Sequence, residues 1–146
     1  MGTSGVVRIK DEFSGEFIGN IYKQCDGYVS GYGKEIKEIL KGCSIINGIT
    51  HTSGEKPKDI PEFFNGMGCM AAYLIGKLKG NRIGHFYIVP RVHGPGDYQY
   101  TYDLELSKEV DGLIQISIWH GEDLICKDLL DNVDMENLEK NLPEED

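Results

Sequence analysis

Hydrophobic and polar residues alternate along several segments of the chain, as they do in strands that bury one side. The clearest case is residues 98–106, where Tyr or Leu occupies every second position and polar residues lie between them. Residues 113–120 repeat the alternation with isoleucine. Residues 6–11 and 16–24 contain β-branched residues on either side of a turn with Gly15. A repeat of two predicts half-buried strands, and the last two segments are predicted to form a hairpin.

Two segments instead have the spacing of helices. Residues 34–41 place three apolar residues on one face and end at Gly42, as helices commonly do. Residues 69–79 are apolar nearly all round, which predicts a largely buried helix. After this helix, the apolar run 83–89 predicts a strand, whereas residues 51–61 are polar, contain proline and are predicted to be a loop.

The order of these elements is strand, strand, helix, helix, strand, strand, strand. Because helices and strands do not alternate, we predict an α+β fold in which an antiparallel sheet of about five strands carries two helices on one face. The chain of 146 residues has the usual size of one domain. We assign residues 1–121 to a single α+β domain and residues 122–146 to an acidic C-terminal segment, either a helix or a tail.

The net charge of −9 comes almost entirely from residues 122–146, which hold ten acidic residues and two lysines. The rest of the chain is nearly neutral and has no basic stripe, so we do not expect generic binding of nucleic acid. No apolar run approaches the ~20 residues that span a bilayer, and four widely spaced cysteines give neither a zinc motif nor a disulfide framework. We therefore expect a cytoplasmic protein with reduced thiols, no membrane contact, no metal site and no cofactor.

Two glycine-rich segments each lead into a predicted helix. Residues 26–33 (Asp-Gly-Tyr-Val-Ser-Gly-Tyr-Gly) precede the first helix, and residues 65–68 (Asn-Gly-Met-Gly) precede the second. The start of a helix presents unpaired N–H groups and the positive end of its dipole, which together bind anions. We interpret both segments as parts of a site for a small anionic ligand of nucleotide type. In the alternative interpretation, the glycines only allow turns and close helix packing.

Side chains near these glycines supply the other contacts that a nucleotide needs. Tyr28 or Tyr32 is expected to stack on a base, and Asn47 and Asn65 are expected to bind its polar edge. Arg91 is expected to clamp a phosphate, although a surface charge explains it equally well. The candidate ligand-binding residues are, in full, Asp26, Gly27, Tyr28, Gly31, Tyr32, Gly33, Asn47, Asn65, Gly66, Met67, Gly68 and Arg91.

A second arrangement has the composition of a catalytic site. Cys69 lies near the start of the second helix, and His85 lies on the strand that follows. A helix dipole stabilises a thiolate at such a position, and a histidine can serve it as a base. This order resembles the NlpC/P60 cysteine peptidases, although the Asp-Cys-Ser surroundings of that family are absent. Cys69 and His85 are thus weak catalytic candidates, and the alternative for Cys69 is a buried small hydrophobic residue.

Other polar side chains are interpreted as solvated. Arg8 and Lys10 alternate with the apolar residues of their strand, which is typical of a face in contact with water. Four more residues carry groups that bind metals, but nothing in the sequence sets their spacing, and most fall in predicted turns or at strand ends. We interpret them as solvated loop residues rather than as a metal site. These four are His93, Asp97, His120 and Asp123.

Several blocks of the sequence resemble, in the same order, a family of small uncharacterised proteins of viruses, phages and bacteria. They include the segments Asp-Gly-Tyr-x-x-Gly-x-Gly-x-Glu-Ile and Phe-Asn-Gly-Met-Gly-Cys-Met-Ala-Ala. Relatives often have Trp where this chain has Cys25. The viral distribution implies a counter-defence role, in which the protein binds a host signalling nucleotide or blocks a host protein. The matching blocks are residues 22–36, 46–48, 64–75, 86–90 and 98–102.

Three functions follow, in order of preference. The first is a non-enzymatic module that binds a small anionic ligand of nucleotide type at the two glycine-rich segments. The second is a protein-interaction module that engages a host protein through an exposed strand or the acidic end. The third is a cysteine hydrolase that uses Cys69 and His85. A homodimer is a further prediction, because small antiparallel domains with bare sheet edges often pair.

Overall fold

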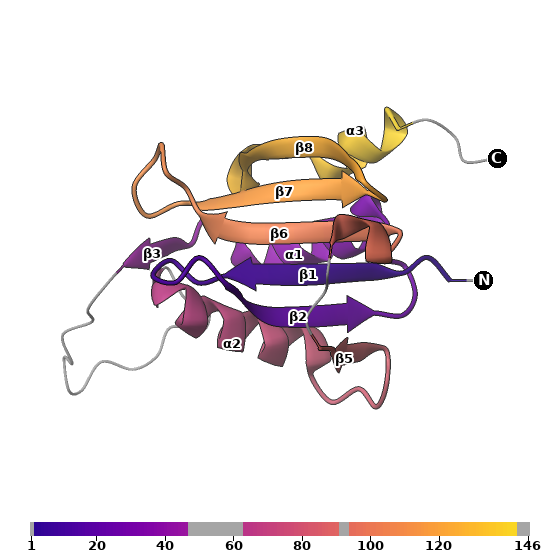
Figure 1. Ribbon diagram of the computed structural model, residues 1–146, viewed down its shortest axis with the longest axis horizontal. Coiled ribbons are helices and arrows are strands. Elements are labelled where there is room, and N and C mark those ends of the chain that lie inside the picture. Colours follow the sequence, from indigo (N-terminus) through magenta and orange to yellow (C-terminus); the bar gives the residue numbers. More distant parts are fainter. Residues whose placement is uncertain (1, 47–62, 91–93, 143–146) are drawn as a thin grey trace.

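A six-stranded sheet forms the centre of the protein, for which a computed structural model describes residues 2–46, 63–90 and 94–142 (Figure 1). The strand order across the sheet is β5-β2-β1-β6-β7-β8. Neighbouring strands run antiparallel, except for β1 and β6, which are parallel. The strands are β1 (Gly5–Lys10), β2 (Phe17–Lys23), β5 (Phe86–Ile88), β6 (Tyr100–Leu106), β7 (Ile114–His120) and β8 (Asp123–Leu129).

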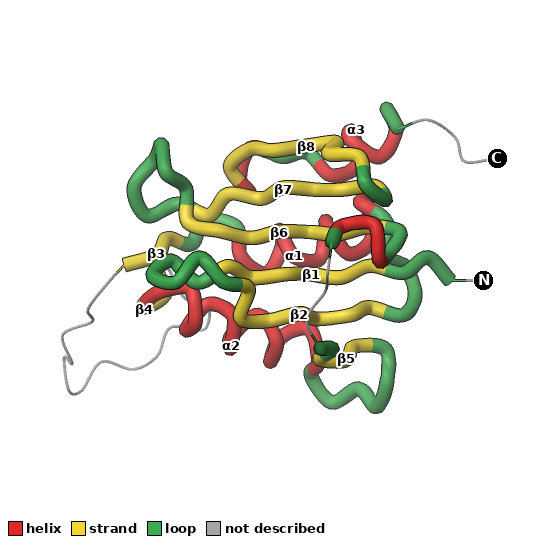
Figure 2. The backbone as a smooth tube through the Cα atoms, viewed as in Figure 1, coloured by secondary structure: helices red, strands yellow, loops and turns green. Residues whose placement is uncertain are grey.

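Two helices cover one face of this sheet. They are α1 (Lys34–Leu40) and α2 (Gly66–Lys79), and they lie behind the sheet in the view of Figures 1 and 2. The facing side of the sheet, called here the helix-free face, carries no α-helix in the described part of the chain, although a short 3₁₀ turn at Pro95–Asp97 lies in front of it (Figure 2). The remaining elements are the two-stranded parallel sheet of β3 (Ser44–Ile46) and β4 (Phe63–Asn65), the C-terminal helix α3 (Met135–Lys140), a π-helical turn at Val29–Gly33, and 3₁₀ turns at Pro95–Asp97 and Leu130–Asn132.

The hydrophobic core lies between the sheet and these two helices. In β1, Val7 and Ile9 point toward the helices because alternate residues of a strand face opposite sides. The rings of Tyr32 and Tyr102 meet edge to face at 5.5 Å in the middle of this layer. The largest fully buried side chains are Tyr32, Tyr102, Ile9, Ile36, Leu40, Met67, Met70, Leu74, Leu104, Ile116, Ile118 and Leu130.

The structure confirms the α+β class and the mostly antiparallel sheet, but the sheet has six strands rather than about five. The additional strand is β8, which was predicted as the start of an acidic helix or tail. It pairs with β7 from Gln115 to His120, so residues 123–129 belong to the sheet. Beyond β8, the α-helix in the described part of the chain is the six-residue α3, and the side chain of Asp134, which caps its start, accepts a hydrogen bond from the N–H of Asn137.

The strand predicted at 83–89 is shorter than expected. Gly84 and His85 have φ angles of 76° and 71°, which place them in a turn before β5 begins. His85 still pairs through its backbone, since its carbonyl accepts a hydrogen bond from the N–H of Gln24 at 3.0 Å. The loop predicted at 51–61 lies outside the described residues.

Candidate functional site

The glycines of the first predicted ligand segment pack against neighbouring backbone. A Cβ atom on Gly27 would lie 2.4 Å from the N atom of Gly5, and one on Gly31 would be equally close to a backbone carbonyl. Only glycine fits at such close approaches. The N–H groups of both glycines are also engaged, since they donate to the carbonyls of Thr3 and Tyr28 at 2.8 and 3.0 Å. These glycines therefore fit the alternative interpretation, that of close packing.

Tyr32 lacks the exposed ring that stacking on a base requires. The side chain is fully buried, and its hydroxyl donates to the carbonyl of Ile21 at 3.0 Å. The stacking role predicted for Tyr32 is therefore wrong. Tyr28 is half-buried, and the nearby negative charge of Asp26 raises the pKa of its hydroxyl. Gly33 is buried between the two helical turns it joins and presents no surface to a ligand.

Glu12, from the hairpin between β1 and β2, fills the anion position at the start of α2. Its Oε2 accepts a hydrogen bond from the N–H of Met67 at 2.7 Å. Gly66 has a φ of 84°, and a Cβ there would lie 3.5 Å from the same carboxylate. Asn65 and Gly68 are exposed beside it. The position that was predicted to hold an external anion is thus taken by a carboxylate of the protein itself.

The two glycine-rich segments lie at opposite ends of β1. Gly27 contacts Gly5 at the start of the strand, whereas Gly66 lies beside Glu12, just beyond its end. Seven residues of extended chain span roughly 23 Å. The two segments therefore do not form one site for a small ligand.

Cys69 and His85 are held apart by the length of α2. Cys69 lies exposed in the first turns of the helix. His85 lies at the other end, where Lys79 Nζ donates to the carbonyl of Gly84 at 3.1 Å. The ten residues from Cys69 to Lys79 correspond to about 15 Å of helix. The structure therefore contradicts the predicted Cys69–His85 pair, because neither side chain can reach the other.

Three of the four metal-binding side chains line one shallow depression of 460 Å³ near the end of β7. They are Asp97, His120 and Asp123, and the His120 ring stacks on Tyr100 at 4.6 Å. Within the described ranges, no three His, Cys, Asp or Glu residues have the geometry to hold a metal ion. The sequence-predicted residues that lie outside these ranges are Asn47, Arg91 and His93.

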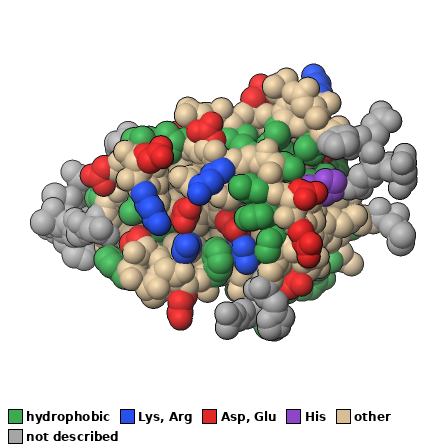
Figure 3. All heavy atoms as spheres, turned by 45° about the horizontal axis from the view of Figure 1, so that its top comes forward, with side chains coloured by type: hydrophobic (Ala, Val, Ile, Leu, Met, Phe, Trp, Pro, Cys, Tyr) green, Lys and Arg blue, Asp and Glu red, His purple; other side chains and the backbone are tan. Residues whose placement is uncertain are grey.

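A buried polar network occupies the centre of the helix-free face. Arg8 binds Asp103 through two hydrogen bonds of 2.6 and 2.7 Å, and Trp119 Nε1 donates to the same carboxylate at 3.2 Å. The Phe17 ring lies 4.1 Å from the Arg8 guanidinium carbon. Arg8 is only 7% exposed, so its predicted solvation is wrong, whereas Lys10 is partly exposed as expected. Figure 3 shows this face with basic side chains interleaved among acidic and hydrophobic ones.

The tip of the β1–β2 hairpin presents one exposed aromatic ring on a fixed turn. Asp11 Oδ2 accepts hydrogen bonds from the N–H and the hydroxyl of Ser14, both at 2.8 Å. These two bonds lower the pKa of Asp11 from its ordinary value of 3.8. Glu12 is held by α2, and Phe13, between these anchored residues, is 79% exposed. The sequence signal was an aromatic residue inside the Asp-Glu-Phe-Ser-Gly turn, where polar residues are usual.

Comparisons with protein-family models, with curated proteins and with solved structures find no match to this chain. Among the described helices, none has the length and apolar character needed to cross a membrane, and the longest, α2, has 14 residues. A functional assignment therefore rests on the geometry of the chain. One surface feature with a defined geometry is the hairpin tip, where Phe13 is exposed on a turn held by hydrogen bonds.

Proposed function

We propose that the protein is a protein-interaction module whose main contact is the tip of the β1–β2 hairpin, residues 11–16. The observation that carries this proposal is the 79% exposure of Phe13 on a turn whose neighbouring side chains are anchored. Exposed aromatic side chains that enter a pocket on a partner contribute much of the affinity of protein interfaces. Phe13 is the anchor residue of this proposal.

The anchored turn lowers the entropic cost of binding. Asp11 fixes Ser14, and Glu12 fixes the hairpin to the start of α2, so little conformational freedom remains to be lost on association. Burial of a phenylalanine side chain contributes roughly 1.5–3 kcal/mol. A rigid hairpin with one projecting ring is thus suited to insertion into a preformed pocket.

The charge of the hairpin tip indicates the chemistry of the partner. Three acidic residues surround Phe13 within residues 11–16, and this segment has no basic residue. A pocket that accepts the ring would therefore be apolar with a basic rim. The resemblance to viral and phage proteins leads us to propose a host protein as the partner. The acidic residues are Asp11, Glu12 and Glu16.

The test compares wild-type protein with Phe13→Ala. The immobilised full chain is used to capture proteins from host lysate, and each captured protein is then purified and titrated by calorimetry. We expect Phe13→Ala to weaken binding at least tenfold without changing the melting temperature, because the ring contributes little to the fold. Ile83→Ala is the matched control, since Ile83 is also an exposed apolar residue, at 102%. Equal binding by wild type and Phe13→Ala would rule out the hairpin tip as the contact.

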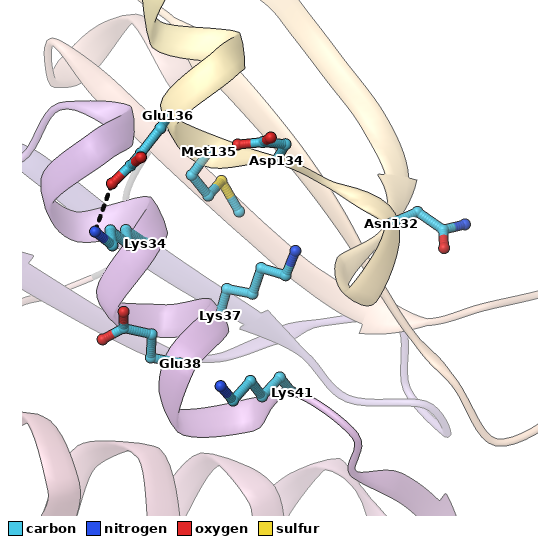
Figure 4. A pocket seen from close by; sticks show the side chains of 8 residues that line it. All are labelled: Lys34, Lys37, Glu38, Lys41, Asn132, Asp134, Met135 and Glu136. Carbon is cyan, nitrogen blue, oxygen red and sulfur yellow. Dashed lines mark hydrogen bonds and ion pairs between the residues drawn. The ribbon is translucent and has the colours of Figure 1, made fainter.

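An open groove beside α1 favours a second candidate function, the capture of a small anionic ligand. The groove has a volume of about 480 Å³ and is shown in Figure 4. Lys34, Lys37 and Lys41 follow one another along α1 at spacings of three and four residues. Lys34 binds Glu136 at 2.6 Å and Lys37 donates to the carbonyl of Val133, whereas Lys41 has no acceptor among the described residues. Lys41 is the cation that supports this candidate.

A thermal-shift screen with linear and cyclic nucleotides tests the groove. A ligand at 100 times its dissociation constant stabilises a fold by about 2.7 kcal/mol. Because Glu38 and Asp134 also line the groove, we expect modest affinity that weakens with added salt. Lys41→Ala should abolish the shift, and Lys108→Ala, which removes an exposed lysine elsewhere, should leave it unchanged. The absence of a shift with every nucleotide would exclude this candidate.

A further inference from the structure

The two edges of the six-stranded sheet differ in the side chains that they expose to solvent. β8 forms one edge and carries the charged residues Asp123, Lys127 and Asp128. Its pairing with β7 is also interrupted by a bulge opposite Ile118 and Trp119. Charged side chains and bulges are the usual means by which proteins prevent an edge strand from pairing with another chain. The β8 edge is therefore protected against association.

The opposite edge also has a bulge, which lies at Ile18 of β2, but it lacks the charged side chains. β5 has only three residues and pairs with residues 21–23 of β2, and the N–H of Val89 donates to the carbonyl of Asn20 at 3.0 Å. Among the described residues, none pairs with Phe17 to Gly19 of β2 on that side. Residues 17–20 and 86–90 contain no charged side chain. Four apolar side chains are exposed here, with exposed fractions between 37 and 73%. We define them as the β2–β5 edge surface: Phe17, Ile18, Tyr87 and Ile88.

Charges of opposite sign lie at the two ends of this surface. At the β5 end, Lys79 Nζ lies 5.6 Å from the Tyr87 ring centroid, and the guanidinium of Arg82 lies 5.5 Å from that of Phe86. The hairpin lies at the other end of β2 (Figure 1). It carries Asp11, Glu12 and Glu16. Lys10 Nζ also lies at this end, 5.9 Å from the Phe17 ring centroid, but it pairs with Glu105 at 3.6 Å. The edge is thus apolar in the middle, with net negative charge at the hairpin end and positive charge at the β5 end.

We propose that a second copy of this chain binds at the β2–β5 edge surface and forms a two-fold symmetric dimer. A two-fold axis at the centre of the edge reverses its direction in the partner. The acidic hairpin of each copy then lies opposite the basic end of the other, and both contacts form at once. The four apolar side chains are buried against their symmetry mates. The acidic residues of the hairpin take part in both proposals, but the dimer does not use the Phe13 ring and does not depend on the function proposed above.

Sedimentation equilibrium of the full chain over a range of concentrations tests the dimer directly. We expect a species of twice the 16.3 kDa monomer mass. On dilution the dimer should dissociate, so the average mass should fall toward that of the monomer. The dimer should also weaken as salt is raised, because the charges at its ends are exposed. A protein that stays monomeric at all concentrations overturns the proposal, and a different partner strand would then be the occupant of this edge.

Two variants locate the interface. Ile88→Lys places a charge in the apolar middle of the edge and should raise the dissociation constant at least tenfold. Leu124→Lys is the matched control, because Leu124 is an exposed apolar residue on the β8 edge, at 46%. Circular dichroism shows whether either variant alters the fold. A dimer that survives Ile88→Lys but is lost in Leu124→Lys would place the interface at β8 and overturn the proposal.

A charge exchange tests the two-fold arrangement itself. Arg82→Glu and Glu16→Lys should each weaken the dimer, since each places like charges opposite one another. The double variant restores opposite charges and should recover most of the lost affinity. Both side chains are exposed, so neither change disturbs the core. Additive losses in the double variant would contradict this geometry.

Discussion

Glu12 in the β1–β2 hairpin accepts a hydrogen bond at 2.7 Å from the backbone N–H of Met67, which lies 55 residues later in the chain. The contact joins the hairpin to the first turn of α2 and satisfies one of the N–H groups that a helix leaves unpaired at its start. It also places a negative charge at the positive end of the helix dipole. One side chain thus stabilises the helix and fixes the hairpin that presents Phe13.

Replacement of Glu12 should therefore destabilise the fold. Glu12→Ala leaves the Met67 N–H without its acceptor and should lower the free energy of unfolding by about 1–2 kcal/mol. Urea denaturation measures this change. Glu16→Ala is the control, because Glu16 lies in the same hairpin and is exposed, so its loss should be small. Equal effects of the two substitutions would show that the contact with α2 does not stabilise the protein.

Two glycine substitutions should have opposite effects. Gly27→Ala brings a methyl group to 2.4 Å from the N atom of Gly5, so the backbone has to move and the melting temperature should fall. Gly68→Ala meets no atom within 4 Å in the first turn of α2 and should stabilise the protein by up to about 1 kcal/mol. Thermal denaturation followed by circular dichroism measures both. A stable Gly27→Ala variant would contradict the packing role of Gly27.

The Arg8–Asp103 ion pair on the helix-free face should be far more sensitive to mutation than the neighbouring Lys10–Glu105 pair. Asp103→Ala leaves the buried Arg8 without its partner and should cost about 3–5 kcal/mol. Glu105→Ala removes the partner of Lys10, at 3.6 Å and partly exposed, and should cost less than about 1 kcal/mol. Denaturation can be followed through Trp119, the single tryptophan, whose Nε1 donates to Asp103. Similar losses in both variants would show that Arg8 remains solvated.

The hairpin tip should loosen only when the pH falls below the lowered pKa of Asp11. The N–H and hydroxyl of Ser14 hold the pKa of Asp11 below 3.8, so the carboxylate stabilises the folded turn at any pH above that value. This contribution is lost as the pH falls through the lowered pKa. The chemical shift of the Ser14 amide should therefore titrate with a midpoint below 3.8. Ser14→Ala should move the pKa of Asp11 upward, toward its ordinary value. A wild-type midpoint at or above 3.8 would exclude the hydrogen bonds between Ser14 and Asp11.

The sequence correctly predicts strands whose two faces differ in polarity. It fails where contacts with residues far away in the chain determine whether a side chain is buried. Tyr100 to Leu106 alternates cleanly because one face meets the core and the other does not. The charged residues and the bulge of β8 conceal the same pattern, so this strand was predicted as helix or tail.

The candidate site was harder to predict than the fold, for the same physical reason. The glycine-rich segments have the local pattern of anion sites, but their neighbours come from elsewhere in the chain: Gly5 packs against Gly27, and Glu12 occupies the start of α2. Arg8 is buried because Asp103, 95 residues away, pairs with it. None of these contacts can be predicted from the local spacing of residues.

The parallel pairing of β1 with β6 sets a condition on how the chain folds. β1 is separated by 95 residues of chain from β6, one of its two neighbours. During synthesis, β1 and β2 can pair as a hairpin, but the open side of β1 has no partner until β6 has left the ribosome. Closure of such a long loop is slow compared with local pairing. Until then, the nascent chain exposes Val7 and Ile9 together with an unpaired strand edge, and this interval is when the protein is most exposed to aggregation.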